Sequence, residues 1–589
     1  MDNQHISVSP FDFKLLANES NEGISISLVS HEEDIYTYQF SFKPEEPRNP
    51  GPITLKWKIP YLNAKGVWKS DAIHNKRQQY DWELEELESR ISVNAPVVSV
   101  FGMHDQNIIT FAARDAINLV KMNALLREED NHLYCHLTFF AEEKTLIEAY
   151  ETEVRIDMRE VLFSDALKGV SRWWEKDSKL TPAAIPPLAS APLYSTWYSF
   201  HQELEVDSLL EELAIAKDLG YDLVILDDGW QTHDSNRGYD FTGDWKPERI
   251  PDMAGFVENI HKLGMKAGLW FSVPFCGKKS LAYQKFKGKF LTESHRWAPV
   301  FDPRFPEVRA YLVQTYVDAV KNWDLDALKL DFIDDFNVYE ETDMELGRGK
   351  DFLNVNEAVD ALMTSVIEGV KAVKPEIVIE FRQRYIGPAM RKYGHMFRAF
   401  DCPNDPITNR IRITDVKLLC GHTVVHSDPI TWHREDSVEN AAIQMVNALF
   451  GVPQISIQLR NAKQDHLDML AFFTSYWKKN RDVLLKGNFV PYNPLGNYPL
   501  LRSSYRGHEI LISFDKIVAE TTVANSLDVF NGSDTSGLLL RLGNDISKAN
   551  MTVYDCMGNI YHQQKAPLKA GLYEFDIPVG GYLQLISSK

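Results

Sequence analysis

The chain has 589 residues, with 63 Lys+Arg against 83 Asp+Glu and therefore a formal net charge of −20. This acidic balance, without any basic block, excludes nucleic acid and an anionic membrane surface as the main partner. The 44% hydrophobic and 25% charged content is typical of a globular protein. No apolar run approaches the roughly 18 residues of a spanning helix, so we expect a soluble chain of several domains that acts on a small neutral molecule.

Two further features concern the compartment. The N-terminal MDNQHISVSPFDF has no basic segment followed by an apolar one, so we expect no secretory signal. The cysteines are odd in number, scattered and without a CxxC pair, which fits a reducing compartment; they are Cys135, Cys276, Cys402, Cys420 and Cys556. We therefore expect a cytoplasmic protein.

Short runs that alternate apolar and polar residues fill residues 1–165, for example GISISLVS, TYQFSFK and ITLKWKI. A period of two is typical of half-buried strands, so this segment is predicted to form an N-terminal β-sandwich. Residues 166–192 contain the helical spacing of KGVSRWWEK and then the proline-rich TPAAIPPLASAP. They are predicted to form a helical linker that ends at a domain boundary.

From residue 193, buried strand-like runs alternate with amphipathic stretches of helix length, the pattern of βα units around a parallel sheet. Eight strands are predicted, at 193–200, 223–230, 266–275, 327–334, 377–384, 397–402, 422–428 and 452–459. Eight such units match a (β/α)8 TIM barrel, which we assign to residues 193–485. Short β runs return over 486–589 and predict a C-terminal antiparallel β-sandwich. The expected fold class is thus a multidomain α/β plus β protein.

Carboxylates end several of the predicted barrel strands, and the C-terminal ends of barrel strands converge on the active site. The residues concerned are Asp227 and Asp228 on the second strand, Lys329 and Asp331 on the fourth, Asp401 on the sixth and Asp428 on the seventh. A single acidic strand end is commonly a helix N-cap. Four converging ends favour an acidic active site.

Lys329 and Asp331 are two apart on a strand, so both side chains project to the same face. A lysine beside a carboxylate keeps that carboxylate ionised, which suits a nucleophile. The alternative for the pair is a structural ion pair, and the residues alone leave both readings open.

A second carboxylate, Asp401, follows Arg398 and is expected to face Asp331 across the barrel mouth. Retaining glycosidases use two carboxyl groups about 5 to 5.5 Å apart, one ionised as nucleophile and one protonated as acid. We expect mutual repulsion to raise the pKa of Asp401 and the lysine to lower the pKa of Asp331. Trp197 and Trp245 lie in polar surroundings near strand ends and are candidates for stacking on a sugar face.

These segments resemble the family 36 glycoside hydrolases of the α-galactosidase clan. The motifs, in order, are YSTWYSF, ILDDGW, FTGDW, GMKAGLWFSVPF, RWAPVFDP, LKLDF and FRAFDCPND. The resemblance implies Asp331 as nucleophile and Asp401 as acid/base. It also implies sugar contacts by Asp227, Asp228, Trp245, Arg296 and Lys329, and we add Trp197, Arg398 and Asp405 to the substrate-binding candidates. Asp405 is also the alternative acid/base.

Two departures from the family pattern concern the sugar. Many family members have a Cys and a Gly-rich run after the fifth strand, where this chain has EFRQRYIGP, and the usual Glu after the third-strand Trp-Phe is Ser272. We expect Arg382 and Arg384 to rebuild the wall near the sugar's 2-hydroxyl. The alternative is that both only pair with acids such as Glu380 and Asp405.

The expected function is that of a retaining glycosidase for terminal α-galactosyl or closely related residues of a small oligosaccharide or glycoside. Transfer of glycosyl groups and α-N-acetylgalactosaminidase activity are alternatives within the family, and self-association is left open. A non-catalytic sugar-binding protein is a rival, although both carboxylates are present. A metal-dependent hydrolase is another, because His422, His426, His433 and Asp428 cluster in sequence. His422 and His426 would lie about 13 Å apart on a strand at 3.3 Å per residue, too far to share an ion, so we expect no metal and no cofactor.

Overall fold

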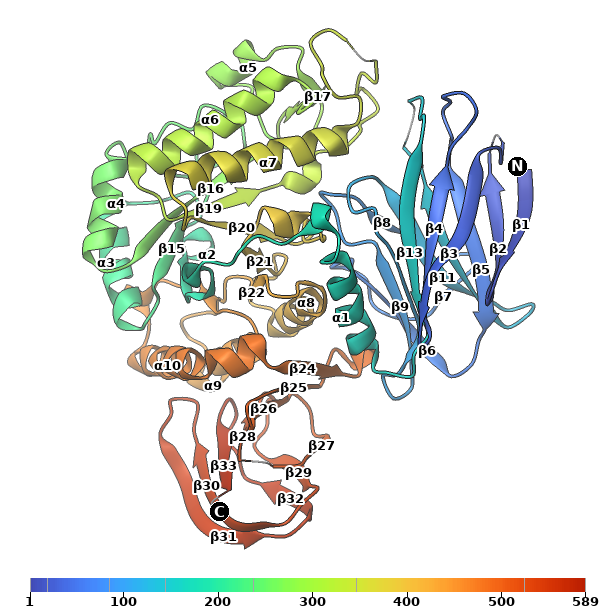
Figure 1. Cartoon of the computed structure of the whole chain (residues 1–589). Coiled ribbons are helices and arrows are strands. Elements are labelled where there is room, and N and C mark those ends of the chain that lie inside the picture. The colour runs from blue at the N-terminus through green and yellow to red at the C-terminus, as the bar shows by residue number, and fades with distance from the viewer. Residues whose placement is uncertain are drawn as a thin grey trace.

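The computed structural model describes residues 2–18, 20–83, 85–142, 145–236, 238–345, 347–523 and 525–587. Figure 1 shows a pair of sheets at the N-terminus, a barrel in the middle and a smaller β-domain at the C-terminus. The predicted fold class is confirmed. Helix α1 (Phe163–Trp174) lies between the N-terminal sheets and the barrel, where the sequence predicts a helical linker.

Two sheets pack face to face in the N-terminal part. The first has the order β1-β2-β5-β12-β11-β7 with β8 beside β11, and the second has the order β3-β4-β13-β10-β9-β6. Alternate residues of both sheets point into one shared core, as the period of two predicts. The strands are β1 (Asp2–Val8), β2 (Phe11–Ala17), β3 (Ile24–Glu32), β4 (Ile35–Phe42), β5 (Ile53–Pro60), β6 (Ala64–Lys69), β7 (Gln79–Tyr80), β8 (Leu87–Ser89), β9 (Val97–Gly102), β10 (Asn107–Ala113), β11 (Val120–Arg127), β12 (His132–Phe139) and β13 (Tyr150–Asp157).

Eight parallel strands form the central barrel, in the order β22-β21-β20-β19-β16-β15-β14-β23. A parallel bridge between His426 and Val452 closes the ring. The strands are β14 (Leu193–Ser195), β15 (Leu223–Leu226), β16 (Lys266–Ser272), β19 (Ala327–Asp331), β20 (Val378–Arg382), β21 (Met396–Arg398), β22 (Val424–His426) and β23 (Gln454–Ile455). All eight predicted strands are present but shorter, because the chain leaves the sheet early and continues into loops at the C-terminal ends of the strands.

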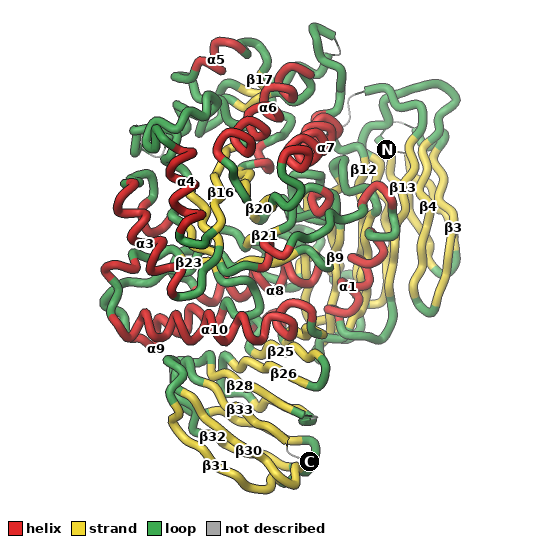
Figure 2. The backbone as a smooth tube through the Cα atoms, turned by 60° about the vertical axis from the view of Figure 1, so that its left-hand side comes forward, coloured by secondary structure: helices red, strands yellow, loops and turns green. Residues whose placement is uncertain are grey.

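Helices surround the barrel strands (Figure 2). They are α2 (Trp197–Phe200), α3 (Val206–Asp218), α4 (Met253–Lys262), α5 (Leu281–Lys285), α6 (Pro306–Trp323), α7 (Val355–Val373), α8 (Pro406–Leu419), α9 (Val438–Asn447) and α10 (Gln464–Lys486). A hairpin of β17 (Phe290–Thr292) and β18 (Val300–Phe301) precedes α6. Helix α2 occupies part of the first predicted strand, because the chain turns into a helix directly after Ser195.

The C-terminal part has a seven-stranded sheet of order β24-β25-β26-β28-β33-β30-β31 and a three-stranded sheet of order β27-β29-β32 around a core of its own. Helices α9 and α10 lie between this part and the barrel (Figure 1). The strands are β24 (Asn488–Tyr492), β25 (Leu500–Tyr505), β26 (His508–Ser513), β27 (Val518–Thr521), β28 (Ser526–Asn531), β29 (Leu538–Leu542), β30 (Ile546–Tyr554), β31 (Ile560–Leu568), β32 (Gly571–Phe575) and β33 (Tyr582–Ser587).

One buried carboxylate joins all three parts. Asp415 of α8 accepts hydrogen bonds from Trp68 Nε1 at 2.9 Å and from Tyr498 Oη at 2.6 Å, and it pairs with Lys76 Nζ at 2.8 Å. Trp68 and Lys76 belong to the N-terminal part and Tyr498 to the C-terminal part. The three parts are therefore tied together by a charged contact that is shielded from water.

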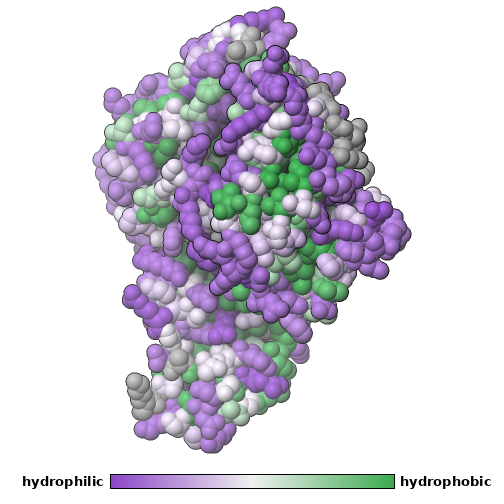
Figure 3. Space-filling view, turned by 45° about the vertical axis from the view of Figure 1, so that its right-hand side comes forward, coloured by the Kyte–Doolittle hydropathy of each residue, from purple (hydrophilic) through white to green (hydrophobic). Residues whose placement is uncertain are grey.

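The surface carries the charge that the composition predicts. Hydrophilic residues cover most of the face in Figure 3, with a hydrophobic patch near its middle. Within the described ranges, no helix combines the length and the apolar character needed to cross a bilayer.

Candidate active site

The C-terminal ends of three adjacent barrel strands bring the central side chains together. Asp331 ends β19, Arg382 ends β20 and Arg398 ends β21. Arg382 and Arg398 are register partners on their two strands, and Asp331 is the register partner of Ser272 on β16. Parallel register therefore places these polar residues in one layer at the barrel mouth.

Asp331, the expected nucleophile, is held by four donors. Its Oδ1 atom accepts hydrogen bonds from Arg382 Nε at 2.6 Å, Tyr385 Oη at 2.8 Å and the Phe332 amide at 2.8 Å. Its Oδ2 atom accepts one, from Trp270 Nε1 at 2.9 Å. Oδ2 is therefore the oxygen with more unused capacity to bond to a substrate.

The charges around Asp331 keep it ionised. Burial raises the pKa of a carboxyl, but the charges of Arg382 and Lys329 outweigh burial and hold the pKa of Asp331 well below its usual value. This direction agrees with the expectation from the sequence. The charge that lowers this pKa most is that of Arg382, and not that of the expected Lys329.

Lys329 makes its ion pair with Asp227, with 2.6 Å between Nζ and Oδ2. The expectation that Lys329 lies directly beside Asp331 is therefore corrected. Both side chains share a face of β19, but Asp227, which directly follows β15 on the far side of β16, reaches the ammonium group of Lys329. The direct partner of Asp331 is Arg382.

Asp401, the expected acid/base, lies in the loop after β21. Its Oδ1 atom accepts a hydrogen bond from Arg398 Nη2 at 2.8 Å, and 44% of its side chain is exposed. Arg398 also pairs with Asp428, and it lies 3.8 Å from Glu380. Asp401 is thus open to solvent on one side and bound to a shared arginine on the other.

The pKa of Asp401 is shifted in the direction opposite to the expected one. Crowding by protein atoms raises it, but Arg398 and Arg382 outweigh crowding and repulsion from Asp331, so the pKa of Asp401 lies below its usual value. The expected direction rests on repulsion between the two carboxylates alone, whereas the charges of the two arginines act in the opposite direction. Burial instead raises the pKa of the neighbouring Asp428 to about 7, although Arg398 lowers it.

The other predicted sugar contacts lie around this centre. Asp228 accepts hydrogen bonds from Gln202 at 2.7 Å and Gln231 at 2.6 Å, and burial raises its pKa to about 6. Trp245 is buried against Trp230, with ring centroids 5.9 Å apart.

Three other residues that are predicted to contact the sugar make local contacts with neighbouring residues. Trp197 begins α2 and meets His201 edge to face. Arg296 is exposed, and its guanidinium lies 4.9 Å from the centroid of the Trp297 ring. Asp405 caps α8 through the Thr408 amide and hydroxyl, which is a structural role.

The alternative that both arginines pair with neighbouring acids holds for Arg382, although its partner is neither Glu380 nor Asp405. Arg382 pairs with Asp331, while Glu380 accepts a hydrogen bond from Gln454. The Nε atom of Arg384 is buried without a hydrogen-bond partner.

Several other buried polar atoms near the strand ends also have no hydrogen-bond partner. They are Ser272 Oγ, Asp334 Oδ1, Gln383 Nε2, Trp245 Nε1 and Arg398 Nε. Buried polar atoms are nearly always hydrogen-bonded, so a group of exceptions in one region needs an explanation. Because the group contains both donors and acceptors, it suits a ligand with hydroxyl groups, which both donate and accept.

Sequence reasoning missed Tyr385 and Tyr239. Tyr385 lies three residues after Arg382 in EFRQRYIGP, and its hydroxyl reaches Asp331. Tyr239 precedes the FTGDW segment and is half-buried; burial, Asp228 and Asp331 raise the pKa of its hydroxyl well above the usual value. Attention to tyrosines close to the family motifs and in the departing EFRQRYIGP segment, in addition to carboxylates, would have indicated both residues.

Of the histidines in the metal-dependent alternative, His426 ends β22 as the register partner of Arg398. His426 is buried, and its Nε2 atom is hydrogen-bonded to the Ala189 carbonyl. In the part of the chain that the structure describes, no three or more His, Cys, Asp or Glu side chains are grouped so as to hold a metal ion.

Comparisons with known proteins show the family and the fold of the chain. The melibiase family model matches residues 187–487. α-Galactosidase Mel36A of Lactobacillus acidophilus is 33% identical over 98 residues, which are 16% of this chain and 13% of that protein. The chain thus matches much less than two thirds of the length of this curated relative.

Solved structures are similar over nearly the whole chain. A variant of the GH36 α-galactosidase AgaA of Geobacillus stearothermophilus, in complex with raffinose, superposes with a TM-score of 0.64 at 15% identity, covering 98% of this chain and 81% of that one. The galactosidase domain of AgaSK, an α-galactosidase/sucrose kinase of Mediterraneibacter gnavus, has a TM-score of 0.66 at 14% identity, with 98% and 82% covered. At these identities the likeness shows the fold.

Proposed function

The chain belongs to the melibiase family, and we propose that it is a retaining glycoside hydrolase that removes terminal α-galactosyl or closely related residues. The observation that carries the proposal is the contrast between two carboxylates on one barrel face. Asp331 is buried among four donors, whereas Asp401 is half-exposed and has one. A nucleophile must be ionised and held still, and an acid/base must exchange protons with a leaving group and then with water.

The first step joins the sugar to Asp331. Its Oδ2 atom attacks the anomeric carbon while Asp401, in its protonated form, gives its proton to the glycosidic oxygen, so that the C–O bond to the leaving group breaks. The product is a covalent glycosyl ester on Asp331. Trp270 and Arg382 orient the carboxylate for this attack.

The second step releases the sugar. Asp401, now ionised, takes a proton from a water molecule whose oxygen attacks the anomeric carbon, and the ester bond to Asp331 breaks. Two displacements at the same carbon retain the anomeric configuration. The lowered pKa of Asp401 favours this base role.

Recognition of the sugar rests on the polar residues around Asp331. We assign hydroxyl contacts to Lys329, Asp227 and Asp228, and ring contacts to Trp245 and Trp197, with Arg296 and Arg398 at the edges of the site. The unpartnered polar atoms nearby support a polyhydroxylated ligand. AgaA with bound raffinose makes α-galactosyl oligosaccharides the first natural substrates to test.

Arg382 and Arg384 are proposed to bind the group at the sugar's 2-position. Arg382 lies in a layer with Asp331, and its charge also lowers the pKa of Asp401, so it acts on both carboxylates. A 2-hydroxyl accepts hydrogen bonds from a guanidinium. This favours a galactoside over a 2-acetamido sugar.

The five cysteines are free and buried, which supports a cytoplasmic enzyme.

A screen of nitrophenyl α- and β-glycosides tests the proposal, followed by proton NMR of the first sugar released from the best substrate. We expect turnover of the α-galactoside and an α-configured first product. A β-configured first product would mean that a water molecule fits between the carboxylates, at about 6.5 to 9.5 Å, and that the mechanism is inverting. An assay with an added sugar acceptor measures the balance between transfer and hydrolysis.

A further inference from the structure

A turn of the N-terminal part, residues 92 to 95, lies against two loops of the catalytic face. The Asn94 amide donates a hydrogen bond to the Arg384 carbonyl at 2.7 Å, in the loop after β20. The Ser92 hydroxyl donates to the Phe336 carbonyl at 3.4 Å, in the loop after β19. One short turn therefore contacts the loops that follow the strands of Arg382 and Asp331.

The turn is firmly anchored in its own domain. Ser70 Oγ donates to the Ala95 carbonyl at 2.7 Å and accepts from the Ala95 amide at 3.0 Å, and Asn94 Nδ2 donates to the Glu88 carbonyl at 2.9 Å. Asn94 has a φ of 56°, in the left-handed region that asparagine tolerates better than most residues. Ala95 is buried in the same hydrophobic cluster as the barrel core.

Gly387 shows how closely the turn approaches the loop after β20. A Cβ atom added to Gly387 would lie 2.5 Å from the Asn94 carbonyl oxygen, which is backbone and has little freedom to move away. The site therefore requires glycine for close approach of two backbones. Any larger residue forces the turn and the loop apart.

The opposite side of the same loop holds the proposed nucleophile. Within residues 382 to 387, Arg382 and the fully buried Tyr385 both donate to Asp331 Oδ1, at 2.6 and 2.8 Å. Arg384 and Gly387, which meet the turn, alternate with these two residues along the chain. A displacement of the loop from the turn therefore moves both donors relative to Asp331.

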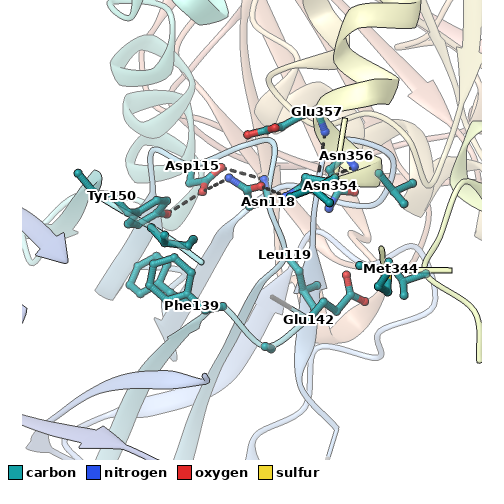
Figure 4. A pocket seen from close by; sticks show the side chains of 17 residues that line it. Asp115, Asn118, Leu119, Phe139, Glu142, Tyr150, Met344, Asn354, Asn356 and Glu357 are labelled. Carbon is teal, nitrogen blue, oxygen red and sulfur yellow. Dashed lines mark hydrogen bonds between the residues drawn. The ribbon is translucent and has the colours of Figure 1, made fainter. Parts of the chain in front are cut away.

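A second contact between the same parts lies farther along the chain. Figure 4 shows Asn118 of the N-terminal part beside Asn354, which caps α7, on the wall of a pocket; Asn354 Nδ2 donates to Asn118 Oδ1 at 2.9 Å. The pocket has a volume of about 160 Å³, and the carboxylate of Asp115 on its wall is already bonded to Asn118 and Tyr150. Residues of the N-terminal part and of the β19–α7 connection both line this pocket, so the two segments are in contact around it.

We propose that the turn at residues 92 to 95 is a positioning element for the nucleophile, with Asn94 and Gly387 as its positioning residues. The N-terminal part is then required for catalysis, because its turn sets the place of Arg382 and Tyr385 and through them the place and charge of Asp331. This inference rests on the proposed function, in which Asp331 attacks the sugar.

The test is Gly387→Ala in the full-length enzyme, assayed with the best nitrophenyl glycoside. A misplacement of up to 1 Å by a change outside the chemistry costs up to about 100-fold in rate, so we expect kcat to fall about 10- to 100-fold with KM within about twofold. Looser contacts with Arg382 and Tyr385 let the pKa of Asp331 rise toward its usual value. The acid limb of the kcat/KM profile is therefore expected to move to higher pH.

Two variants complete the experiment. Gly369→Ala on α7 is the matched control, because its added Cβ would lie 2.9 Å from a Val317 side-chain atom, away from the site; we expect its kcat and pH profile to equal those of the wild type. Asn94→Ala strains the turn from the other side and shows the same kinetic change in milder form. It replaces Gly387→Ala as the test if that variant does not fold.

The outcomes separate the two proposals. An active wild type whose Gly387→Ala and Asn94→Ala variants keep the wild-type kcat and acid limb overturns the positioning role and leaves the function intact. A loss of kcat that Gly369→Ala reproduces also overturns it, since general destabilisation then explains the effect. A wild type without activity on any glycoside overturns the proposed function itself.

Discussion

Arg382 and Arg398 are register partners on adjacent parallel strands, and each binds a different carboxylate of the proposed pair. Arg382 donates to Asp331 at 2.6 Å and Arg398 donates to Asp401 at 2.8 Å. The two proposed catalytic carboxylates therefore each bind one of two arginines on adjacent strands, and both arginines favour the ionised carboxylates. Their roles differ through exposure, because Asp331 is buried and Asp401 reaches solvent.

Replacement of Asp331 tests the nucleophile. Asp331→Asn keeps the shape of the side chain but removes its charge, so turnover is expected to fall by several orders of magnitude, since the covalent route is lost. Steady-state kinetics and the melting temperature are measured together. Asp318→Asn on the exposed face of α6 is the control, because its carboxylate bonds only to Gln314 of the same helix outside the site, and it is expected to retain the wild-type turnover. Near-normal activity of Asp331→Asn would remove Asp331 from the mechanism.

Replacement of Asp401 separates the acid role from the base role. Asp401→Ala is expected to lose most activity on substrates with poor leaving groups and to keep more on activated aryl glycosides, which leave without a proton. Added azide is expected to restore turnover on the aryl glycoside, because azide attacks the glycosyl ester without a base. Equal losses on both substrates and no response to azide would assign Asp401 to binding.

The pKa directions predict an acidic working range. Asp331 must be ionised, and its lowered pKa keeps it so at acidic pH; Asp401 must be protonated for the first step, and its lowered pKa makes that form scarce as pH rises. The kcat/KM for a poor leaving group is therefore expected to fall with increasing pH from the acidic range upward. An activated aryl glycoside is expected to show a flatter profile.

The variant Arg382→Gln tests whether Arg382 lowers the pKa values of the two carboxylates. Arg382 lowers the pKa of both Asp331 and Asp401, so its removal raises both, and both limbs of the kcat/KM profile move to higher pH. Limbs that stay in place would show that other charges set the two pKa values.

The specificity prediction concerns the sugar's 2-position. In Arg382→Ala and Arg384→Ala, the loss of a charged hydrogen bond is expected to cost about 1.5 to 3 kcal/mol, or roughly 10- to 150-fold in kcat/KM, for the 2-hydroxy substrate. The 2-deoxy substrate is expected to change less, because it cannot make that bond. Equal losses on both substrates in both variants would mean that neither arginine binds the 2-substituent.

Periodicity along the chain predicted the elements, and it could not predict which partners the strands bring together. Eight strands were predicted because each is an apolar run between punctuated helical stretches. The partner of Lys329 was missed because a shared face on β19 does not show which other strand end approaches its side chain, and that end is Asp227, directly after β15. The pKa direction of Asp401 was missed for a similar reason. It depends on Arg382 and Arg398, whose alignment follows from the register of β20 and β21.

The contacts between the three parts of the molecule also could not be predicted from the sequence. Asp415 lies in the middle of α8 and reads as an ordinary polar helix residue, yet it is buried against Trp68, Lys76 and Tyr498 from the two β-domains. Asn94 and Gly387 are far apart along the chain, and nothing in the EFRQRYIGP segment of Gly387 indicates that Asn94 is its neighbour. Long-range pairs of this kind follow from how domains dock, which no local pattern records.

The last prediction concerns stability at this junction. Asp415→Ala leaves Lys76 as an unpaired buried charge, which costs about 3 to 5 kcal/mol when one partner of a buried ion pair is removed. Asp405→Ala on the same helix removes only the exposed N-cap and is expected to cost about 1 kcal/mol.

Calorimetry and chemical denaturation of both variants therefore compare two aspartates of α8 in one experiment. We expect a clearly larger fall in melting temperature for Asp415→Ala, together with earlier unfolding of the β-domains, and near-normal KM for Asp405→Ala. Equal shifts in the two variants would show that the junction contributes no more to stability than a helix cap does.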